Sequence, residues 1–402
     1  MKLETPPLAL YLHFPWCVRK CPYCDFNSYA LSGELPEAAY LAALSRDLRE
    51  QAAFPAVSGR PLTSVFMGGG TPSLFSPAAI GRVLDEARSL FGFAPDVEIT
   101  LEANPGTIER GRFAEYAAVG VNRVSLGAQS FGAKQLQVLG RIHSVADTAR
   151  GAEELHAAGL SNFNLDLMYG LPEQDVAGAC SDLRQALALA PAHISHYHLT
   201  MEPGTVFGAR PPPLPTEDSV ELMLAACAAE LAAAGLGHYE VSAYAHAGRR
   251  CRHNLNYWAF GDYLGVGAGA HGKITDAAAA VIVRTTHTRD PRRYQAGTAL
   301  AVRTVPAADL PFEFMMNALR LTEGFAVAGF EARTGLRFEQ VAPTLLVQQG
   351  RGLLRGVQGQ WAPTPTGLRF LNDLLLEFLP DSPGAAEPVG SLYTGVTGHF
   401  GK

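Results

Sequence analysis

The sequence predicts an α/β protein: a partial (β/α)6 barrel followed by a smaller C-terminal α+β module of winged-helix-like type. Six short apolar runs alternate with stretches of helical spacing in the first half of the 402-residue chain, as in parallel strands joined by right-handed crossovers. Hydrophobic residues make up 48% of the chain and charged residues 17%, so a large core is expected. An open doubly wound sheet is the alternative, and in both folds ligands bind at the carboxyl ends of the strands.

The expected strands are Leu8–Phe14, Leu62–Met67, Val97–Leu101, Arg123–Ala128, Asn162–Met168 and His193–Leu199. The expected helices between them are Glu37–Ala53, Pro77–Leu90, Ile108–Ala118, Val145–Ala158 and Val176–Ala190. Pro77 and Glu37 stand where a first helical turn tolerates proline and favours an acid. The strands and helices therefore alternate as six units.

The pattern changes at the proline-rich stretch near residues 200–216, which we interpret as a linker. Further expected elements are a helix over Ser219–Ala234, a strand over His238–Ala245, helices over Phe312–Leu321, Phe338–Gln349 and Thr366–Phe378, and a strand-like segment over Leu353–Trp361. We predict a barrel over residues 1–215, a barrel extension over 216–305, the C-terminal module over 306–380 and a flexible tail over 381–402.

Charge and composition exclude several classes of protein. The net charge is −6 and no block of lysine and arginine stands out, so a nucleic-acid partner is not expected. The first residues lack the apolar core of a signal peptide, and no run reaches the roughly 18–20 apolar residues of a membrane span. Because three of the six cysteines cluster instead of spreading as disulfide pairs, we expect a cytoplasmic protein that binds a metal.

The clustered cysteines are Cys17, Cys21 and Cys24, in a C-x3-C-x2-C run directly after the first expected strand. Three thiolates this close can bind three corners of an iron–sulfur cube and leave one iron open for chemistry. A structural zinc site or a reactive thiol is the alternative, although zinc sites usually combine two cysteine pairs. The spacing therefore favours an iron–sulfur cluster.

Polar and glycine residues follow the expected strands at the end where the fold rule places a site. Gly69 and Gly70 lie in Met67-Gly68-Gly69-Gly70-Thr71-Pro72, where a backbone without Cβ atoms can approach a ligand closely. Glu102, Gln129 and Asp166 lie at or near strand ends, and a buried acid needs a partner or a ligand. Each of these features alone is also compatible with a turn or a structural ion pair.

The cysteine run, with Tyr23 before its third cysteine, and the Gly-Gly-Gly-Thr-Pro segment resemble the radical S-adenosylmethionine (radical SAM) superfamily. The resemblance implies a 4Fe-4S cluster on Cys17, Cys21 and Cys24. It also implies that the open iron chelates the amino and carboxylate groups of S-adenosylmethionine, which an electron from the cluster cleaves to methionine and a 5′-deoxyadenosyl radical.

Four further segments resemble the oxygen-independent coproporphyrinogen III oxidase family: Leu101–Gly106, Leu126–Phe131, Leu139–Arg141 and Asp166–Pro172. The resemblance covers nearly the whole chain. By this similarity, the S-adenosylmethionine site is lined by Tyr11, Tyr23, Gly69, Gly70, Thr71, Glu102, Gln129, Arg141 and Asp166. Arg141 suits a carboxylate, and the acids and the amide suit hydroxyls or an ammonium.

Two departures point to a branch of that family. The oxidases carry a fourth cysteine where this chain has Phe26, and a longer segment before the cluster than the sixteen residues found here. Both features, and the segment His253-Asn254-Leu255-Asn256-Tyr257-Trp258, resemble the HemW-type haem chaperones.

The HemW resemblance implies that this HNxxYW segment binds haem. His253 is a plausible axial ligand, and Tyr257 and Trp258 offer aromatic faces to a porphyrin, with Asn254 in the same segment. The expected partners are haem as cargo, acceptor haem proteins such as respiratory ones, an electron donor and peripheral contact with membrane-bound acceptors. The alternative is an enzyme: a coproporphyrinogen III oxidase or another radical SAM enzyme that acts on a tetrapyrrole.

Overall fold

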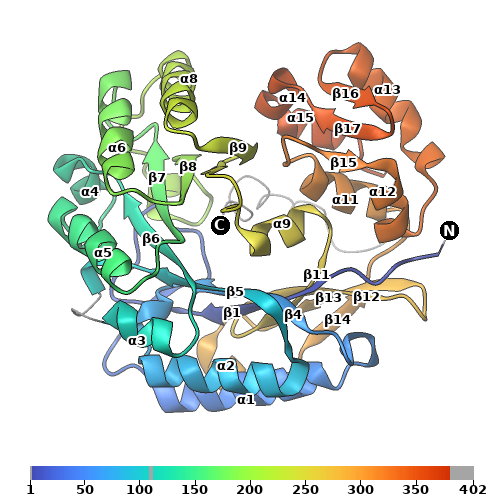
Figure 1. Ribbon diagram of the computed structural model, residues 1–402, viewed down its shortest axis with the longest axis horizontal. Helices are drawn as coiled ribbons and strands as arrows, with labels where there is room; N and C mark the ends of the chain where they lie inside the picture. The colour runs from blue at the N-terminus through green and yellow to red at the C-terminus, as the bar shows by residue number, and fades with distance from the viewer. Residues whose placement is uncertain (1, 108–111, 381–402) are drawn as a thin grey trace.

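The computed structural model describes residues 2–107 and 112–380, so the predicted tail over 381–402 lies outside the described residues. An open, strongly curved sheet of 12 strands dominates the fold, and helices cover its outer face (Figure 1). Its strand order is β14-β13-β12-β11-β1-β4-β5-β6-β7-β8-β10-β9. The sheet does not close on itself, which agrees with the predicted partial barrel.

Seven neighbouring strands of this sheet run parallel. They are β11 (Asp262–Val266), β1 (Leu8–Phe14), β4 (Leu62–Gly69), β5 (Phe93–Ala103), β6 (Arg123–Gln129), β7 (Phe163–Tyr169) and β8 (His193–His198). All six predicted strands are present. The seventh, β11, comes from a segment where no strand was expected, and it pairs with β1 on the side away from β4.

Where the structure describes them, the helices that follow these strands agree with the prediction to within a few residues; residues 108–111 of the expected helix Ile108–Ala118 lie outside the described part of the chain. These helices are α1 (Glu37–Ala52), α2 (Pro77–Phe91), α3 (Arg112–Ala118), α4 (Ala133–Val138), α5 (Val145–Ala157), α6 (Val176–Ala188) and α8 (Glu217–Ala233), of which α4 was not expected. Sequence signals explain where two of them begin. The Ser76 hydroxyl accepts the Ala79 N–H before Pro77 of α2, and Ser144 and Asp147 form a reciprocal capping box at α5.

Two predicted strands are wrong in detail, because each is a hairpin. His238–Ala245 divides into the antiparallel pair β9 (Gly237–Glu240) and β10 (Ala243–Ala245), and Leu353–Trp361 divides into β16 (Leu354–Val357) and β17 (Gln360–Pro363). The turn of the second hairpin contains Gln358 at φ 50° and Gly359 at φ 80°, a pair that permits a tight reversal. The other sheet extensions are β12 (His271–Asp276), β13 (Val281–Thr286) and β14 (Ala301–Thr304).

The C-terminal module combines helices with a three-stranded antiparallel sheet and has its own hydrophobic core. Its elements are α11 (Leu310–Ala318), β15 (Phe325–Ala326), α12 (Val327–Thr334), α13 (Ala342–Gly350), β16, β17, α14 (Pro365–Arg369) and α15 (Leu371–Leu376). This core also takes in Leu3, Phe260 and Ile282 from the rest of the chain. The predicted domain boundaries stay predictions.

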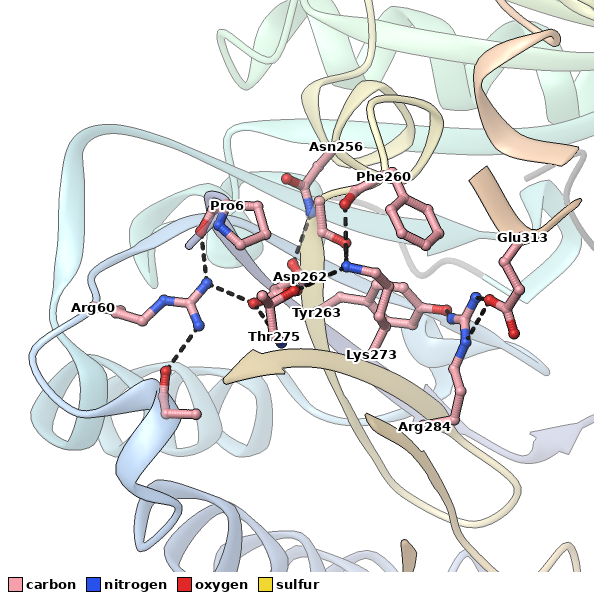
Figure 2. Close-up of polar contacts among 12 residues, drawn as sticks. Pro6, Arg60, Asn256, Phe260, Asp262, Tyr263, Lys273, Thr275, Arg284 and Glu313 are labelled. Carbon is pink, nitrogen blue, oxygen red and sulfur yellow. Dashed lines mark hydrogen bonds and ion pairs between the residues drawn. The ribbon is translucent and has the colours of Figure 1, made fainter. Parts of the chain in front are cut away.

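A buried ionic cluster fixes the strands next to β1 (Figure 2). The Asp262 carboxylate accepts from Lys273 Nζ at 2.9 Å, from Arg60 Nη2 at 2.9 Å and from the Thr275 hydroxyl at 2.7 Å. Burial lowers the pKa of Lys273, and Asp262 partly offsets that effect. Because neither Asp262 nor Lys273 reaches solvent, each charge depends on the other for its stability.

A second ionic contact joins the sheet to the C-terminal module. Arg284 on β13 donates from Nη1 to the Tyr263 hydroxyl at 2.6 Å and from Nε to Glu313 on α11 at 3.0 Å (Figure 2). The short helix α9 (Arg252–Trp258) packs between the barrel strands and α11. None of the described helices is both long and apolar enough to cross a lipid bilayer.

Candidate functional site

A cavity of about 310 Å³ opens at the carboxyl ends of the parallel strands, where the fold rule places a site. Most of the predicted cofactor residues line it: Cys17, Cys21, Tyr23, Cys24, Gly69, Gly70, Thr71, Glu102, Gln129, Arg141 and Asp166. These residues come from six different strand ends and loops of the sequence. The fold therefore brings the predicted cluster and S-adenosylmethionine residues together.

The three cysteines of the loop after β1 are unpaired and half-buried at the cavity wall. Burial raises the pKa of Cys17 to about 11, and burial also raises the pKa of Cys24. Among the described residues, no three His, Cys, Asp or Glu side chains gather around a single-ion position.

The glycine run after β4 brings its backbone against the cysteine loop. The Gly70 N–H donates to the Phe14 carbonyl at 2.7 Å, and the Thr71 N–H donates to the Trp16 carbonyl at 2.8 Å. A Cβ on Gly70 would lie 2.6 Å from the Trp16 carbonyl oxygen, so no other residue fits without a backbone shift. The glycine is thus needed to hold the cysteine loop in place.

The polar residues at the strand ends are each held by named partners. Glu102 accepts the Gly69 N–H at 3.1 Å, and the Tyr197 hydroxyl donates to Gln129 Oε1 at 2.6 Å. Gln129 has φ 66°, a left-handed conformation that is uncommon for a residue other than glycine and that often marks a functional site. The left-handed backbone and the hydrogen bond from Tyr197 together fix the orientation of the Gln129 amide at the cavity wall.

Arg141 lies in the loop after α4 and links the cavity wall to the cluster loop. Its Nη2 donates to the Gly127 carbonyl at 2.8 Å, and its Nη1 lies 3.7 Å from Cys21 Sγ. Burial works to lower the pKa of Arg141, but Tyr23 and Cys21 outweigh it and raise the pKa above the ordinary value. Arg141 is therefore a fixed positive charge, which suits the carboxylate of a ligand.

The structure does not place Tyr11 in the cavity lining. Its hydroxyl lies 3.0 Å from His13 Nδ1, and its ring lies near the rings of Phe66 and His253 in the barrel interior. The predicted contact of Tyr11 with S-adenosylmethionine stays a prediction.

The HNxxYW segment forms α9, and its histidine is packed inside the protein. His253 is 1% exposed; its Nδ1 lies 3.1 Å from the Ser64 hydroxyl and its Nε2 lies 3.1 Å from the Tyr257 hydroxyl. Burial, and secondarily Arg123, lowers the pKa of His253 to about 3. In this conformation both ring nitrogens are occupied, so neither is available to an iron atom.

The other two members of the segment face different surroundings. Asn254 is half-buried, and Trp258 is 2% exposed with the Arg320 guanidinium 4.4 Å above its ring. Arg320 itself lines the cavity and contacts Glu240 at 3.3 Å. Only the Arg320 side chain therefore separates Trp258 from the cavity.

Tyr197, His196 and His198 line the cavity without having a predicted role. Tyr197 had no signal beyond its place at the end of β8. His196 and His198 share one face of that strand, and each of their rings stacks on Tyr169, with centroid distances of 4.6 and 5.4 Å. Burial lowers the pKa of His196 to about 4, so a neutral imidazole lies at the cavity wall.

Comparisons with known proteins agree with this architecture. The model of the radical SAM superfamily matches residues 11–183, and the model of the HemN C-terminal domain matches residues 305–370. The structure of coproporphyrinogen III oxidase (HemN) from Escherichia coli superposes with a TM-score of 0.78 over 93% of this chain and 90% of that chain. Its sequence identity is 23%, so this likeness shows the fold alone.

Closer relatives carry the name heme chaperone HemW. The protein of that name from Escherichia coli (strain K12) is 48% identical over 380 residues, which cover 94% of this chain and 100% of the relative. The one from Haemophilus influenzae is 46% identical over 94% of this chain and 99% of the relative. The chain therefore belongs to the HemW family of the radical SAM superfamily.

Proposed function

We propose that this protein is a haem chaperone, which binds haem and passes it to acceptor haem proteins. The observation that carries the proposal is the identity of 48% to a heme chaperone HemW along that relative's entire length. The cavity adds support, because Phe26 lines it beside the three cysteines and stands where the related oxidases carry a fourth cysteine. The proposed acceptors include respiratory haem proteins, with peripheral contact at a membrane.

The residues of the cavity fit the two cofactors that the family implies. Cys17, Cys21 and Cys24 would hold a 4Fe-4S cluster, since three unpaired thiols on one loop are the donor set that such a cluster takes. S-adenosylmethionine would lie beside them, with Arg141 for its carboxylate and Asp166 for hydroxyl groups. When bound, the pair supplies one-electron reductive chemistry, and an external electron donor is required.

We further propose that the HNxxYW segment receives the haem and that α9 loosens when it does. His253 is neutral, as an iron ligand must be, but its two nitrogens are bonded to Ser64 and Tyr257 in the packed conformation. Binding of iron therefore competes with these two hydrogen bonds. The observed association constant for haem equals the intrinsic association constant multiplied by the fraction of molecules in which α9 is open.

The experiment is a hemin titration followed by absorption in the Soret region, with three variants beside the wild type. His253→Ala should lose the ligand-shifted Soret band, whereas His246→Ala, which changes an exposed histidine, should keep it. If His196→Ala loses the band and His253→Ala keeps it, the haem ligand lies in the cavity and the assignment to α9 is wrong. A wild type that binds no hemin would overturn the chaperone function.

The second candidate function is oxygen-independent oxidation of coproporphyrinogen III or another tetrapyrrole reaction. The observation in its favour is that every residue predicted to bind the cluster or S-adenosylmethionine, except Tyr11, lines one cavity. Anaerobic turnover of coproporphyrinogen III by the reconstituted protein with a reductant is the deciding assay. Formation of protoporphyrinogen IX over many turnovers would favour the enzyme over the chaperone.

We infer that the protein works in the cytoplasm. All six cysteines are unpaired, which suits a reducing compartment. Exposure of a cysteine-ligated cluster to an oxidising compartment would not favour its assembly.

A further inference from the structure

A continuous chain of hydrogen bonds connects the start of α9 with the Asp166 carboxylate in the cavity. The Cys251 N–H donates to the Tyr239 oxygen at 3.3 Å, and the Tyr239 hydroxyl donates to His193 Nε2 at 2.8 Å. His193 Nδ1 donates to Asn164 Oδ1 at 2.6 Å, and Asn164 Nδ2 donates to Asp166 Oδ1 at 2.9 Å. Each member passes one hydrogen bond to the next.

The surroundings of Asn164 fix the direction of this chain. Its Oδ1 also accepts the backbone N–H of Ser195 at 2.9 Å, and its Nδ2 also donates to the Ser125 hydroxyl at 2.8 Å. The amide can therefore point only one way, so His193 carries its proton on Nδ1 and accepts at Nε2. Burial, assisted by Arg123, lowers the pKa of His193 well below the ordinary value, so the ring is neutral.

All four side chains of the chain are shielded from water. Tyr239, His193, Asn164 and Asp166 are each 1% exposed. In such surroundings hydrogen bonds polarise one another, and a donor or acceptor that loses its partner has no water to replace it. Loss of the hydrogen bond at Tyr239 should therefore affect Asp166 more strongly than it would in a chain exposed to water.

The far end of the chain belongs to the helix that carries the proposed haem ligand. Glu98 on β5 accepts the backbone N–H groups of Arg252 at 2.9 Å and of His253 at 3.3 Å, next to the Cys251 N–H that Tyr239 binds. The first turn of α9 is thus held by two buried acceptors. A shift of the first turn of α9 that separates His253 from Ser64 would also shift the nearby Cys251 N–H, which donates to Tyr239.

We propose that Asn164 and His193 are positioning residues for Asp166, and that Tyr239 makes the orientation of this carboxylate depend on the position of α9. The inference rests on the proposed function, in which Asp166 contacts S-adenosylmethionine and α9 binds haem. It has a thermodynamic consequence. Haem must change the affinity for S-adenosylmethionine, and S-adenosylmethionine must change the affinity for haem by the same factor.

The first arm of the test uses the full-length protein with its cluster reconstituted and without haem. The dissociation constant of S-adenosylmethionine is measured by calorimetry, and the EPR spectrum of the reduced cluster is recorded with and without it. Asn164→Ala should weaken binding at least about tenfold, because the carboxylate loses its donor at 2.9 Å and is left with longer contacts, such as that with the Ser125 hydroxyl at 3.4 Å. Tyr239→Phe, which removes one hydroxyl far from the ligand, should weaken it about two- to fivefold.

The matched control is Tyr244→Phe, which removes a buried phenol from the neighbouring strand and lies outside the chain. It should bind S-adenosylmethionine like the wild type. Should Asn164→Ala fail to fold, Tyr239→Phe against Tyr244→Phe carries the comparison. Asn164→Ala that folds and binds with wild-type affinity overturns the positioning role, as does equal behaviour of the two tyrosine variants.

The second arm repeats the calorimetry with saturating hemin. The wild type and Tyr244→Phe should show a shift of at least about threefold in the dissociation constant, and Tyr239→Phe should show none. An equal shift in Tyr239→Phe overturns the coupling through this chain. A wild type that binds no hemin overturns the proposed function, but the first arm still decides the positioning role. A wild type that binds no S-adenosylmethionine overturns both the cofactor site and this inference.

Discussion

Replacement of Ser64 by alanine should make the protein bind hemin more tightly. In the packed conformation the Ser64 hydroxyl lies 3.1 Å from His253 Nδ1, so it competes with any other use of that ring. The substitution removes only this hydroxyl and leaves the members of the HNxxYW segment unchanged. Removal of this hydroxyl group should therefore strengthen hemin binding.

The size of the effect follows from the energy of one buried hydrogen bond. The net contribution of such a bond is about 0.5–1.5 kcal/mol, which corresponds to a factor of about 2–13 in the open fraction of α9. If His253 Nδ1 stays buried without a partner, the packed conformation is destabilised by at most about 3 kcal/mol, and the open fraction of α9 rises further. The dissociation constant for hemin should fall by the same factor.

The assay is a hemin titration of wild type, Ser64→Ala and the control Thr63→Val. Thr63 is the neighbouring residue on β4, and its hydroxyl donates to the Leu8 carbonyl at 3.1 Å without contacting His253. The control should bind hemin like the wild type. Unchanged or weaker binding by Ser64→Ala would refute the argument that packing of His253 limits access to haem.

Three further predictions concern stability and the cavity. Asp262→Asn should lower the free energy of unfolding by about 3–5 kcal/mol in urea denaturation, because it leaves the buried Lys273 without its carboxylate; Asp96→Asn, which breaks an exposed pair, should leave it unchanged. Although burial alone would raise it, the pKa of Asp262 is held below its ordinary value of 3.8 by its partners, mainly Lys273. Its contribution is thus complete above pH 3.8 and lost as the pH falls below that value, so the wild type should show an acid-induced loss that Asp262→Asn lacks. Gly70→Ala should abolish cluster assembly, read from the absorption of the reconstituted protein, since its Cβ has no room; full assembly would contradict the packing argument. Tyr197→Phe should weaken S-adenosylmethionine binding a few-fold, at about the level of one hydrogen bond, and wild-type calorimetry would exclude an orienting role.

The parts of the fold that are encoded locally were predictable. The six strands and the helices between them follow from apolar runs and capping residues, and the cysteine loop follows from its spacing. The position of β11 was not predictable in this way, because its partner β1 lies about 250 residues earlier and only the tertiary fold brings them together. The hairpins were missed because a short reversal inside an apolar run barely changes the pattern.

In the candidate site, too, some features are encoded locally and others depend on the tertiary fold. The cavity is lined by nearly all residues predicted to bind the cluster or S-adenosylmethionine, because strand ends of a parallel sheet converge wherever the sheet curves. Whether a side chain at such a place is accessible depends on its neighbours from other elements. His253 has the residue type of a ligand, yet Ser64 and Tyr257 occupy it, and no pattern in α9 alone contains the contact with β4.

The position of β1 has a consequence for the biogenesis of the protein. This strand carries the cysteine loop, and it lies between β4, made early, and β11, made only after some 260 residues have been synthesised. Until β11 docks, one edge of β1 presents unpaired backbone groups, which is the usual starting point of aggregation. Truncated chains that end before Asp262 should therefore aggregate, and β1, the strand before the cysteine loop, reaches its final pairing only late in synthesis.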